Sequence, residues 1–221
     1  MKKKDSNQTR QAILNAAIQV FAQKSYTAAS IRMIANQGGV PHALIRYYFS
    51  TKADLFDAAA QSICAELCRA SEQAILEVRT MNRTQGFSCY VCRLIEFSRK
   101  NPWTFRIFLL NLSAETVETV PGRTRFLDTV ESVRKQLVQS LRFKAPHEDL
   151  CRFSDSFNAL LFYYLGTPES AAWLLQLDPD SDTYYQWVHQ TLVGIFLPAL
   201  EDLFQGTWKT ENTCYDLDRD K

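Results

Sequence analysis

A pair of glycines at positions 38 and 39 separates two short segments whose apolar residues follow helical spacing. In the first segment, Ile31, Ile34 and Ala35 form one apolar stripe at i, i+3 and i+4, which is typical of a two-turn helix. Ser30 is a suitable N-cap, and glycine tolerates the left-handed conformation that ends such a helix. The sequence therefore predicts a short helix followed by a tight turn.

The segment after the turn reads as a second two-turn helix with two chemically different sides. Pro41 fits the first helical position, where its missing N–H costs nothing. Three apolar residues are expected to point inward, namely Val40, Ile45 and Phe49. The outward side then combines small, basic and phenolic residues, namely His42, Ala43, Arg46 and Tyr47, with Lys52 close behind.

This outward side suits the major groove of DNA. Ala43 allows close approach, His42 can donate or accept at a base edge, and Arg46 can pair with guanine or grip a phosphate. Tyr47 and Lys52 can bind phosphate oxygens and fix the register. The pattern predicts a helix-turn-helix DNA reader, and the alternative is an ordinary helical corner in an all-α protein.

The same residues resemble the TetR/AcrR family of bacterial transcriptional regulators. The family pattern runs Thr/Ser-x-Arg-x-Ile-Ala-x-x-x-Gly-Val-Ser, four variable residues, then Tyr-x-Phe-x-x-Lys-x-x-Leu-Phe. The positions that match it are Ser30, Arg32, Ile34, Ala35, Gly39, Val40, Tyr47, Phe49, Lys52, Leu55 and Phe56. The chain departs from the usual residues at Ser25, Pro41 and Arg46. Because Arg46 lies on the reading face, no operator sequence can be carried over from the family.

The resemblance implies DNA contacts at eight positions. It implies a base contact from Arg32, groove contacts from His42, Ala43, Leu44 and Arg46, and phosphate contacts from Tyr47 and Lys52, with Ser30 assisting.

The rest of the chain reads as helices separated by proline, glycine and asparagine. The expected helices cover residues 52–80, 86–100, 102–114, from after 122 to 143, 147–165, 168–177 and 181–204. Nine or ten helices in all predict an all-α fold. The expected divisions are a DNA-binding domain at 8–66, a helical effector-binding and dimerisation domain at 67–206, and a polar tail at 207–221.

Charge is distributed unevenly along the chain. Residues 1–60 carry 8 basic and 3 acidic side chains, whereas the rest carries 17 basic and 21 acidic ones. A basic head on a mildly acidic body suits a DNA-facing module joined to a regulatory one. The lysines at positions 2–4 precede no apolar run, so they predict a solvated tail or a basic arm on the DNA backbone. No stretch reaches the ~18–20 apolar residues of a membrane helix, and a cytoplasmic protein is expected.

Neither cysteines nor histidines form a convincing chemical site. Cys89 and Cys92 make a Cys-x-x-Cys pair, but it lies within an apolar helical pattern and lacks a second pair. Buried thiols are therefore favoured, with a redox or metal sensor as the alternative, and no metal or cofactor is expected. His42, His147 and His189 have no ligand-spaced partners, and no phosphate loop or nucleophile elbow is present, so an enzyme is not predicted.

Two of the last helices carry wide apolar stripes. The simplest interpretation is that both helices belong to the core of a single chain. The family resemblance instead implies that they pair with a second copy in a four-helix dimer interface, as a palindromic DNA site requires. The residues assigned to this interface are Phe153, Phe157, Leu160, Leu161, Val188, Leu192, Ile195, Phe196 and Ala199.

The resemblance also implies an effector pocket among the middle helices. Its expected lining is Trp103, Phe105, Arg106, Phe108, Leu109, Phe126, Tyr163 and Tyr164, although core filling explains each aromatic residue equally well. The predicted function is a homodimeric repressor that leaves a pseudo-palindromic operator in double-stranded DNA when a small-molecule effector binds. The alternative to a ligand-responsive regulator is a constitutive architectural DNA binder.

Overall fold

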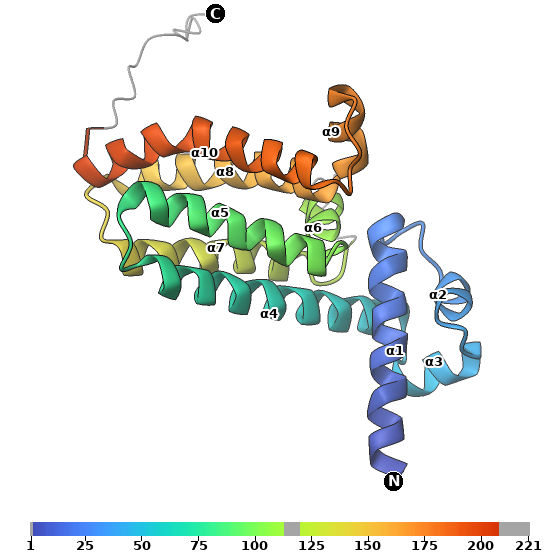
Figure 1. The fold of residues 1–221 in the computed structure, drawn as a ribbon. Helices are drawn as coiled ribbons and strands as arrows, with labels where there is room; N and C mark the ends of the chain where they lie inside the picture. Colours follow the sequence, from blue (N-terminus) through green and yellow to red (C-terminus); the bar gives the residue numbers. More distant parts are fainter. Residues whose placement is uncertain (1, 113–119, 208–221) are drawn as a thin grey trace, which may run out of the picture.

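The computed structural model describes residues 2–112 and 120–207, and every regular element in these ranges is a helix (Figure 1). The all-α prediction is therefore confirmed. The helices are α1 (Lys2–Gln23), α2 (Ile31–Gly38), α3 (His42–Tyr48), α4 (Lys52–Val78), α5 (Arg83–Lys100), α6 (Thr104–Leu112), α7 (Arg123–Leu141), α8 (His147–Gly166), α9 (Pro168–Leu175) and α10 (Asp182–Gln205).

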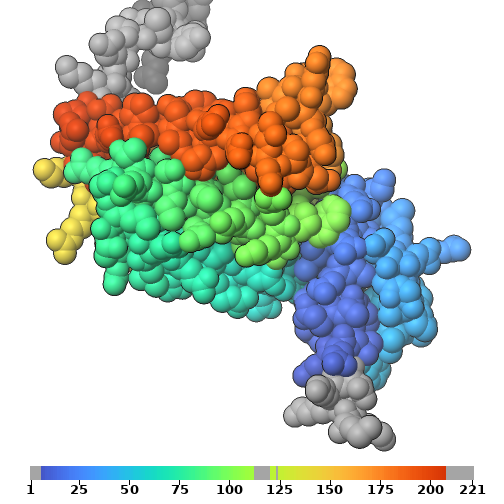
Figure 2. Space-filling model, viewed as in Figure 1, coloured from blue at the N-terminus to red at the C-terminus, as the bar shows by residue number. Residues whose placement is uncertain are grey.

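The first three helices form an N-terminal lobe that projects beyond the rest of the molecule (Figures 1 and 2). The apolar stripe of α1 is its core, with Ile13, Ala17 and Phe21 fully buried. Helix α2 lies close against α1, since a Cβ on Gly38 would stand 3.1 Å from the Cβ of Ala16. A larger residue than glycine would push the two helices apart at this point.

Helix α4 joins this lobe to the body. It starts at a capping box in which the Thr51 hydroxyl accepts from the Asp54 amide at 3.0 Å and the Asp54 carboxylate accepts from the Thr51 amide at 3.0 Å. Its first turns pack against α1, while its later turns pack against α5 and α7. One continuous helix therefore belongs to both parts of the molecule.

The body is a bundle built around α4, α5, α7, α8 and α10 (Figure 1). Helix α5 packs on α4 and α10, α8 packs on α10 and α6, and α7 packs on α4 and α6. The backbone of α8 approaches α6 closely at Gly166, where a Cβ would stand 3.0 Å from the carbonyl oxygen of Phe105. The short helix α6 lies at the end of the bundle that faces the N-terminal lobe and contacts α1, while α9 projects from the same end of the bundle (Figure 1).

Aromatic rings fill the joint between lobe and body. Phe56 of α4 packs edge-on against Phe21 of α1 at 4.8 Å between ring centroids, and it meets Phe126 of α7 at 6.3 Å. Beside this joint, Arg125 of α7 forms a bidentate ion pair with Asp57 of α4 at 2.9 Å. The joint is thus one packed cluster shared by α1, α4 and α7.

The helix boundaries agree with those expected from the sequence, with a few differences. Pro41 is the N-cap of α3 and not its first residue, because its extended ψ of 138° leaves it just outside the helix. The N-terminal lysines belong to the backbone of α1, which begins at Lys2, in place of the expected tail. The expected tail at 208–221 and the end of the helix expected at 102–114 lie outside the described residues. Among the described helices, none combines the length and hydropathy of a membrane-spanning segment.

Candidate DNA-binding surface and ligand cavity

The turn between α2 and α3 has the geometry that the glycines predicted. The Ser30 hydroxyl accepts from the Met33 amide at 3.3 Å, which caps α2. Gly39 adopts φ +60°, a left-handed conformation that side chains other than glycine rarely take. The amide of Val40 then returns to the carbonyl of Ala35 at 3.1 Å. This closed turn fixes the angle at which α3 leaves α2.

Helix α3 is held against the lobe by its inner side and by contacts from α1. Ile45 is fully buried and Phe49 is 5% exposed, as the sequence predicted. The guanidinium of Arg10 lies over the Phe49 ring at 5.0 Å, and the hydroxyls of Ser6 and Tyr48 are 3.1 Å apart. The orientation of α3 is therefore set by packing and not left to a mobile loop.

The outer side of α3 is open to solvent. His42, Ala43 and Arg46 are exposed, and Tyr47 is 79% exposed although it is a large aromatic residue. Arg32 at the start of α2 is exposed as well. No acidic residue occurs between Asp5 and Asp54, so this surface is cationic. It offers a guanidinium, an imidazole and a phenol from a rigid helix, which is the chemistry of base-edge and phosphate contacts.

Two of the eight predicted DNA-contact residues are placed differently from the others. Leu44 is half-buried and packs on the hydrophobic core, so it offers little surface to a groove. Lys52 points its ammonium at the carbonyls of Tyr26 and Ala29, at 2.9 and 3.0 Å, and lies 4.4 Å from the centroid of the Tyr26 ring. Lys52 therefore ties α4 to the loop before α2, and its phosphate contact stays a prediction.

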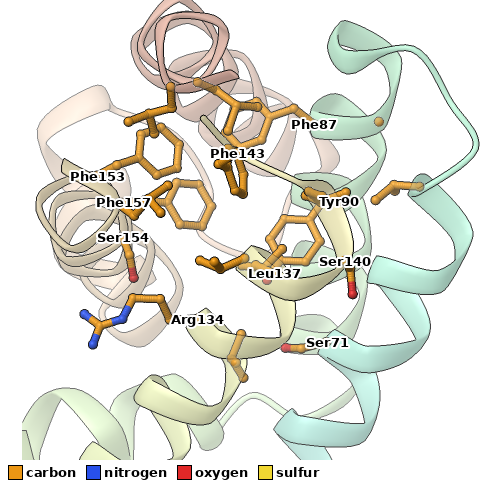
Figure 3. Close-up of a pocket in the computed structure, with 18 of the residues that line it drawn as sticks. Ser71, Phe87, Tyr90, Arg134, Leu137, Ser140, Phe143, Phe153, Ser154 and Phe157 are labelled. Carbon is orange, nitrogen blue, oxygen red and sulfur yellow. The ribbon is translucent and has the colours of Figure 1, made fainter. Parts of the chain in front are cut away.

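The body contains a cavity of about 370 Å³ between α4, α5, α7, α8 and α10. Its wall is apolar and partly aromatic: Figure 3 shows Phe153 and Phe157 of α8 near Phe143, with Phe87 and Tyr90 of α5 beside them. Burial raises the pKa of Tyr90 to about 12, while the side-chain hydrogen bond to Ser71 acts in the opposite direction. The Tyr90 phenol is thus uncharged at neutral pH.

The cavity lies elsewhere than the effector residues predicted from the sequence. Of that set, only Phe105 lines it. Phe108 and Phe126 are fully buried and pack against each other at 4.9 Å in the joint, and Arg106 pairs with Glu169 at 3.3 Å. The remaining residues, half-buried at other positions, are Trp103, Leu109, Tyr163 and Tyr164. The structure does not gather these residues around this cavity, and an effector site at their positions stays a prediction.

The residues that do line the cavity were largely missed. Phe87, Tyr90 and Leu94 follow i, i+3 and i+7 along α5, a stripe that the sequence displays but that looks like any core stripe. Only the packing of α5 against α4 and α10 shows that their side chains enclose a cavity.

The predicted dimer interface divides into buried and surface residues. Five of its members are at most 6% exposed within a single chain, which leaves no face for a partner: Phe157, Leu161, Val188, Leu192 and Phe196. Phe153, Phe157 and Leu161 line the cavity instead. Leu160 and Ala199 are half-buried and Ile195 is 51% exposed, so for these three residues the interface stays a prediction.

Three of the described cysteines, Cys64, Cys89 and Cys92, lack the lowered pKa of a reactive thiol. Burial raises the pKa of Cys64 to about 11, and burial together with neighbouring glutamates raises the pKa values of Cys89 and Cys92. A raised pKa lowers the thiolate fraction and hence the reactivity. Nowhere in the described ranges do three or more His, Cys, Asp or Glu side chains gather as metal ligands. These observations disfavour cysteine-based sensing at these positions.

A glycine turn, a solvent-facing cationic helix and an attached helical body define the class of helix-turn-helix DNA-binding transcriptional regulators. Residues 13–59 match the family model of bacterial regulatory proteins of the tetR family. These residues therefore form a TetR-type DNA-binding segment, and the resemblance seen in the sequence is confirmed.

A curated relative agrees with this assignment. The chain is 37% identical over 54 residues to the HTH-type transcriptional regulator AcrR of Shigella flexneri. That stretch is 24% of this chain and 25% of the relative, so the chain matches about a quarter of the relative's length.

Solved structures share the fold over a longer range. The TetR family transcriptional regulator PfmR from Thermus thermophilus has a TM-score of 0.59 at 15% identity, covering 89% of this chain and 99% of that one. A linker-substituted mutant of HlyIIR has a TM-score of 0.57 at 19% identity, covering 85% of this chain and 98% of that one. At such identities the likeness shows the fold alone.

Proposed function

We propose that the protein is a homodimeric repressor. The two copies of α3, one from each chain, bind a pseudo-palindromic operator, and a small-molecule effector releases the dimer from it. The observation that carries the DNA side of this proposal is the solvent-facing, acid-free surface of α2 and α3, held rigidly by Gly39 and by the buried Ile45. In this role Arg46 and His42 read base edges, Ala43 permits close approach, and Tyr47 contacts phosphate.

Ser30 and Arg32 complete the proposed DNA surface from the N-terminus of α2. Ser30 already caps the helix, and the free amides beside it suit a phosphate oxygen. The proposed DNA-binding domain covers residues 8–66 and the proposed regulatory domain residues 67–206, with α4 passing through both. A bacterial transcriptional regulator binds chromosomal DNA in the cytoplasm, so a cytoplasmic location is part of the proposal.

The outer faces of α8 and α10 support the proposed dimer. Ile195 is 51% exposed, and a Cβ added to the adjacent Gly194 would meet no atom within 4 Å. Leu160 of α8 and Ala199 of α10 are half-buried, and the rings of Tyr164 and Trp187 pack together at 5.3 Å across the two helices. Apolar and small side chains on an open helix face suit close packing with the same face of a second chain.

The cavity and the joint support ligand control. Phe105 and Phe162 line the cavity, Phe108 packs on Phe162 at 5.5 Å, and Phe126 connects Phe108 to Phe56 of the joint. A ligand that favours one arrangement of these rings also favours one position of α4 relative to α1. In a dimer this changes the separation of the two α3 helices, and only a spacing of about 34–36 Å fits successive turns of the groove.

The proposal is tested by capturing random genomic DNA fragments on the purified protein at physiological salt and sequencing what is retained. Enrichment of one pseudo-palindrome, bound by two chains per site, supports the dimeric regulator. Retention of DNA without sequence preference and with a steep salt dependence supports an architectural binder instead. The enriched site then serves as the probe for the substitutions argued below.

A further inference from the structure

We infer that the cavity in the body takes an amphipathic organic anion, with the apolar part enclosed between the helices and the anionic head group at an arginine-bearing rim. This inference rests on the proposed function, because it names the chemical class of the effector. It comes from the charge of the wall: of the residues that line the cavity, every one with a charged side chain is an arginine, namely Arg79, Arg83, Arg134 and Arg142.

The interior fixes the apolar part of the ligand. Side chains such as Phe87, Leu137, Phe153 and Phe157 enclose it, and the Tyr90 phenol, whose pKa burial raises to about 12, adds no charge. An ionised group placed among these rings would lose its hydration without a compensating charge. The ligand's charge therefore has to sit at an edge of the cavity.

The rim lies at the end of the bundle farthest from the N-terminal lobe. Arg79 follows the last residue of α4, Arg83 begins α5 and Arg142 follows α7, and these helix ends meet at one side of the bundle in Figure 1. The guanidinium of Arg83 lies 4.6 Å from the centroid of the Phe204 ring, which in turn stacks on Phe143 at 4.4 Å. Aromatic wall and cationic rim are thus in direct contact.

Within the part of the chain that the structure describes, no carboxylate pairs with these three rim arginines. None of Arg79, Arg83 and Arg142 forms an ion pair with a described residue, and all three are exposed. Uncompensated guanidinium groups are strong ligands for carboxylate and phosphate oxygens.

Arg134 differs from the rim arginines, although it also lines the cavity. It pairs with Glu131 one turn earlier and with Asp155 of α8 at 3.9 Å. In Figure 3 its nitrogens point away from the aromatic rings. Its charge is already compensated, so we assign the head group to the rim.

The inference is tested by isothermal titration calorimetry of the full-length protein with matched ten-carbon probes: decanoate, decanol and decylamine, each below its aggregation concentration. Decanoate is expected to bind tightest and decylamine weakest. Across octanoate, decanoate and dodecanoate, affinity is expected to rise about fourfold per added methylene until the cavity is full. Equal or tighter binding of decylamine, or no binding of any carboxylate, would overturn the inference.

Variants locate the head group. The triple variant Arg79→Gln, Arg83→Gln, Arg142→Gln is expected to weaken decanoate binding by about tenfold or more and to leave decanol binding unchanged. Arg69→Gln, which removes an exposed arginine of α4 outside the cavity, is the matched control and is expected to change neither. If the triple variant binds decanoate like the unmodified protein, the rim assignment is wrong.

The outcomes separate this inference from the proposed function. If decanoate binds through the rim arginines but operator DNA stays bound, the ligand class is supported and release by the ligand fails. If the protein binds a palindromic operator and carboxylates do not bind at all, the regulator stands and the ligand class fails.

Discussion

At the scale of single residues, the proposed reading face of α3 consists of exposed side chains that lie outside the core of the lobe. Arg46 is exposed, and its backbone belongs to a helix whose orientation is set by Ile45 and Phe49. Removing the Arg46 side chain should therefore leave the fold intact. This separation makes the reading face testable without confusing binding with folding.

Arg46→Ala is expected to weaken binding to the captured operator by about 1–3 kcal/mol and to relax the base preference at the position it reads. The measurement is fluorescence anisotropy with the operator and with a scrambled duplex at the same salt concentration. Urea unfolding of the variant, expected to match the unmodified protein, is the control. Unchanged affinity and unchanged preference would show that α3 does not present Arg46 to the bases.

Lys52 is the opposite case, because its ammonium is engaged inside the protein. Lys52→Met is expected to lower the free energy of unfolding by about 1–2 kcal/mol, since the carbonyls of Tyr26 and Ala29 lose a charged donor. Thermal and urea unfolding check this. The comparison is Lys24→Met on the exposed surface, expected to leave stability unchanged. A stable Lys52 variant with uniformly weaker DNA binding would restore the phosphate contact as its main role.

At the scale of helices, the sequence predicts where elements begin and end better than which way they face. Caps and breaks are local: Ser30, Thr51 and Ser181 cap α2, α4 and α10 by hydrogen bonds to amides within three residues. The turn at Gly39 was likewise predictable, because glycine adopts φ +60° without the steric cost that a side chain adds. Each of these features depends on a few consecutive residues, so it can be predicted from the local sequence.

The cavity could not be predicted in this way, because it depends on which helices pair. Phe153 and Phe157 are stacked neighbours on α8 that suit a core, a cavity or a partner interface equally well by spacing. Only the edge-on contact of both rings with Phe196 of α10, at 5.6 and 5.3 Å, turns them inward. The same pairing leaves Ile195 facing out at 51% exposure, whereas the adjacent Phe196 is 6% exposed.

The outward-facing Ile195, next to the inward-facing Phe196 on α10, leads to a prediction for the dimer. Ile195→Glu is expected to shift the protein from dimer to monomer, because a carboxylate would be buried without a partner at the centre of the proposed interface. Sedimentation velocity across a concentration series measures it. Leu76→Glu is a matched control, since Leu76 of α4 is also 51% exposed but lies on another face of the body. Dimers that persist in Ile195→Glu would place the interface elsewhere.

At the scale of the whole molecule, the cavity and the DNA surface are connected by packed rings and not by a flexible linker. Phe105 and Phe162 of the cavity wall pack at 5.7 Å, Phe108 and Phe126 continue the row, and Phe56 carries it to Phe21 of α1. The ion pair between Asp57 and Arg125 runs beside this row. A dense row of large side chains changes arrangement in discrete steps, which is what coupling two distant sites needs.

Phe126 lies in the middle of the row, between Phe108 and Phe56, and does not line the cavity. Phe126→Leu is expected to leave ligand affinity and ligand-free operator affinity within about threefold of the unmodified protein, while the factor by which ligand weakens operator binding falls severalfold toward one. Operator titrations with and without saturating ligand give that factor directly. Phe97→Leu is the control, since Phe97 packs edge-on against Phe105 at 6.1 Å but lies off the row to α1. If both variants keep the full factor, coupling runs through α4 alone, and shortening Asp57 or Arg125 becomes the discriminating change.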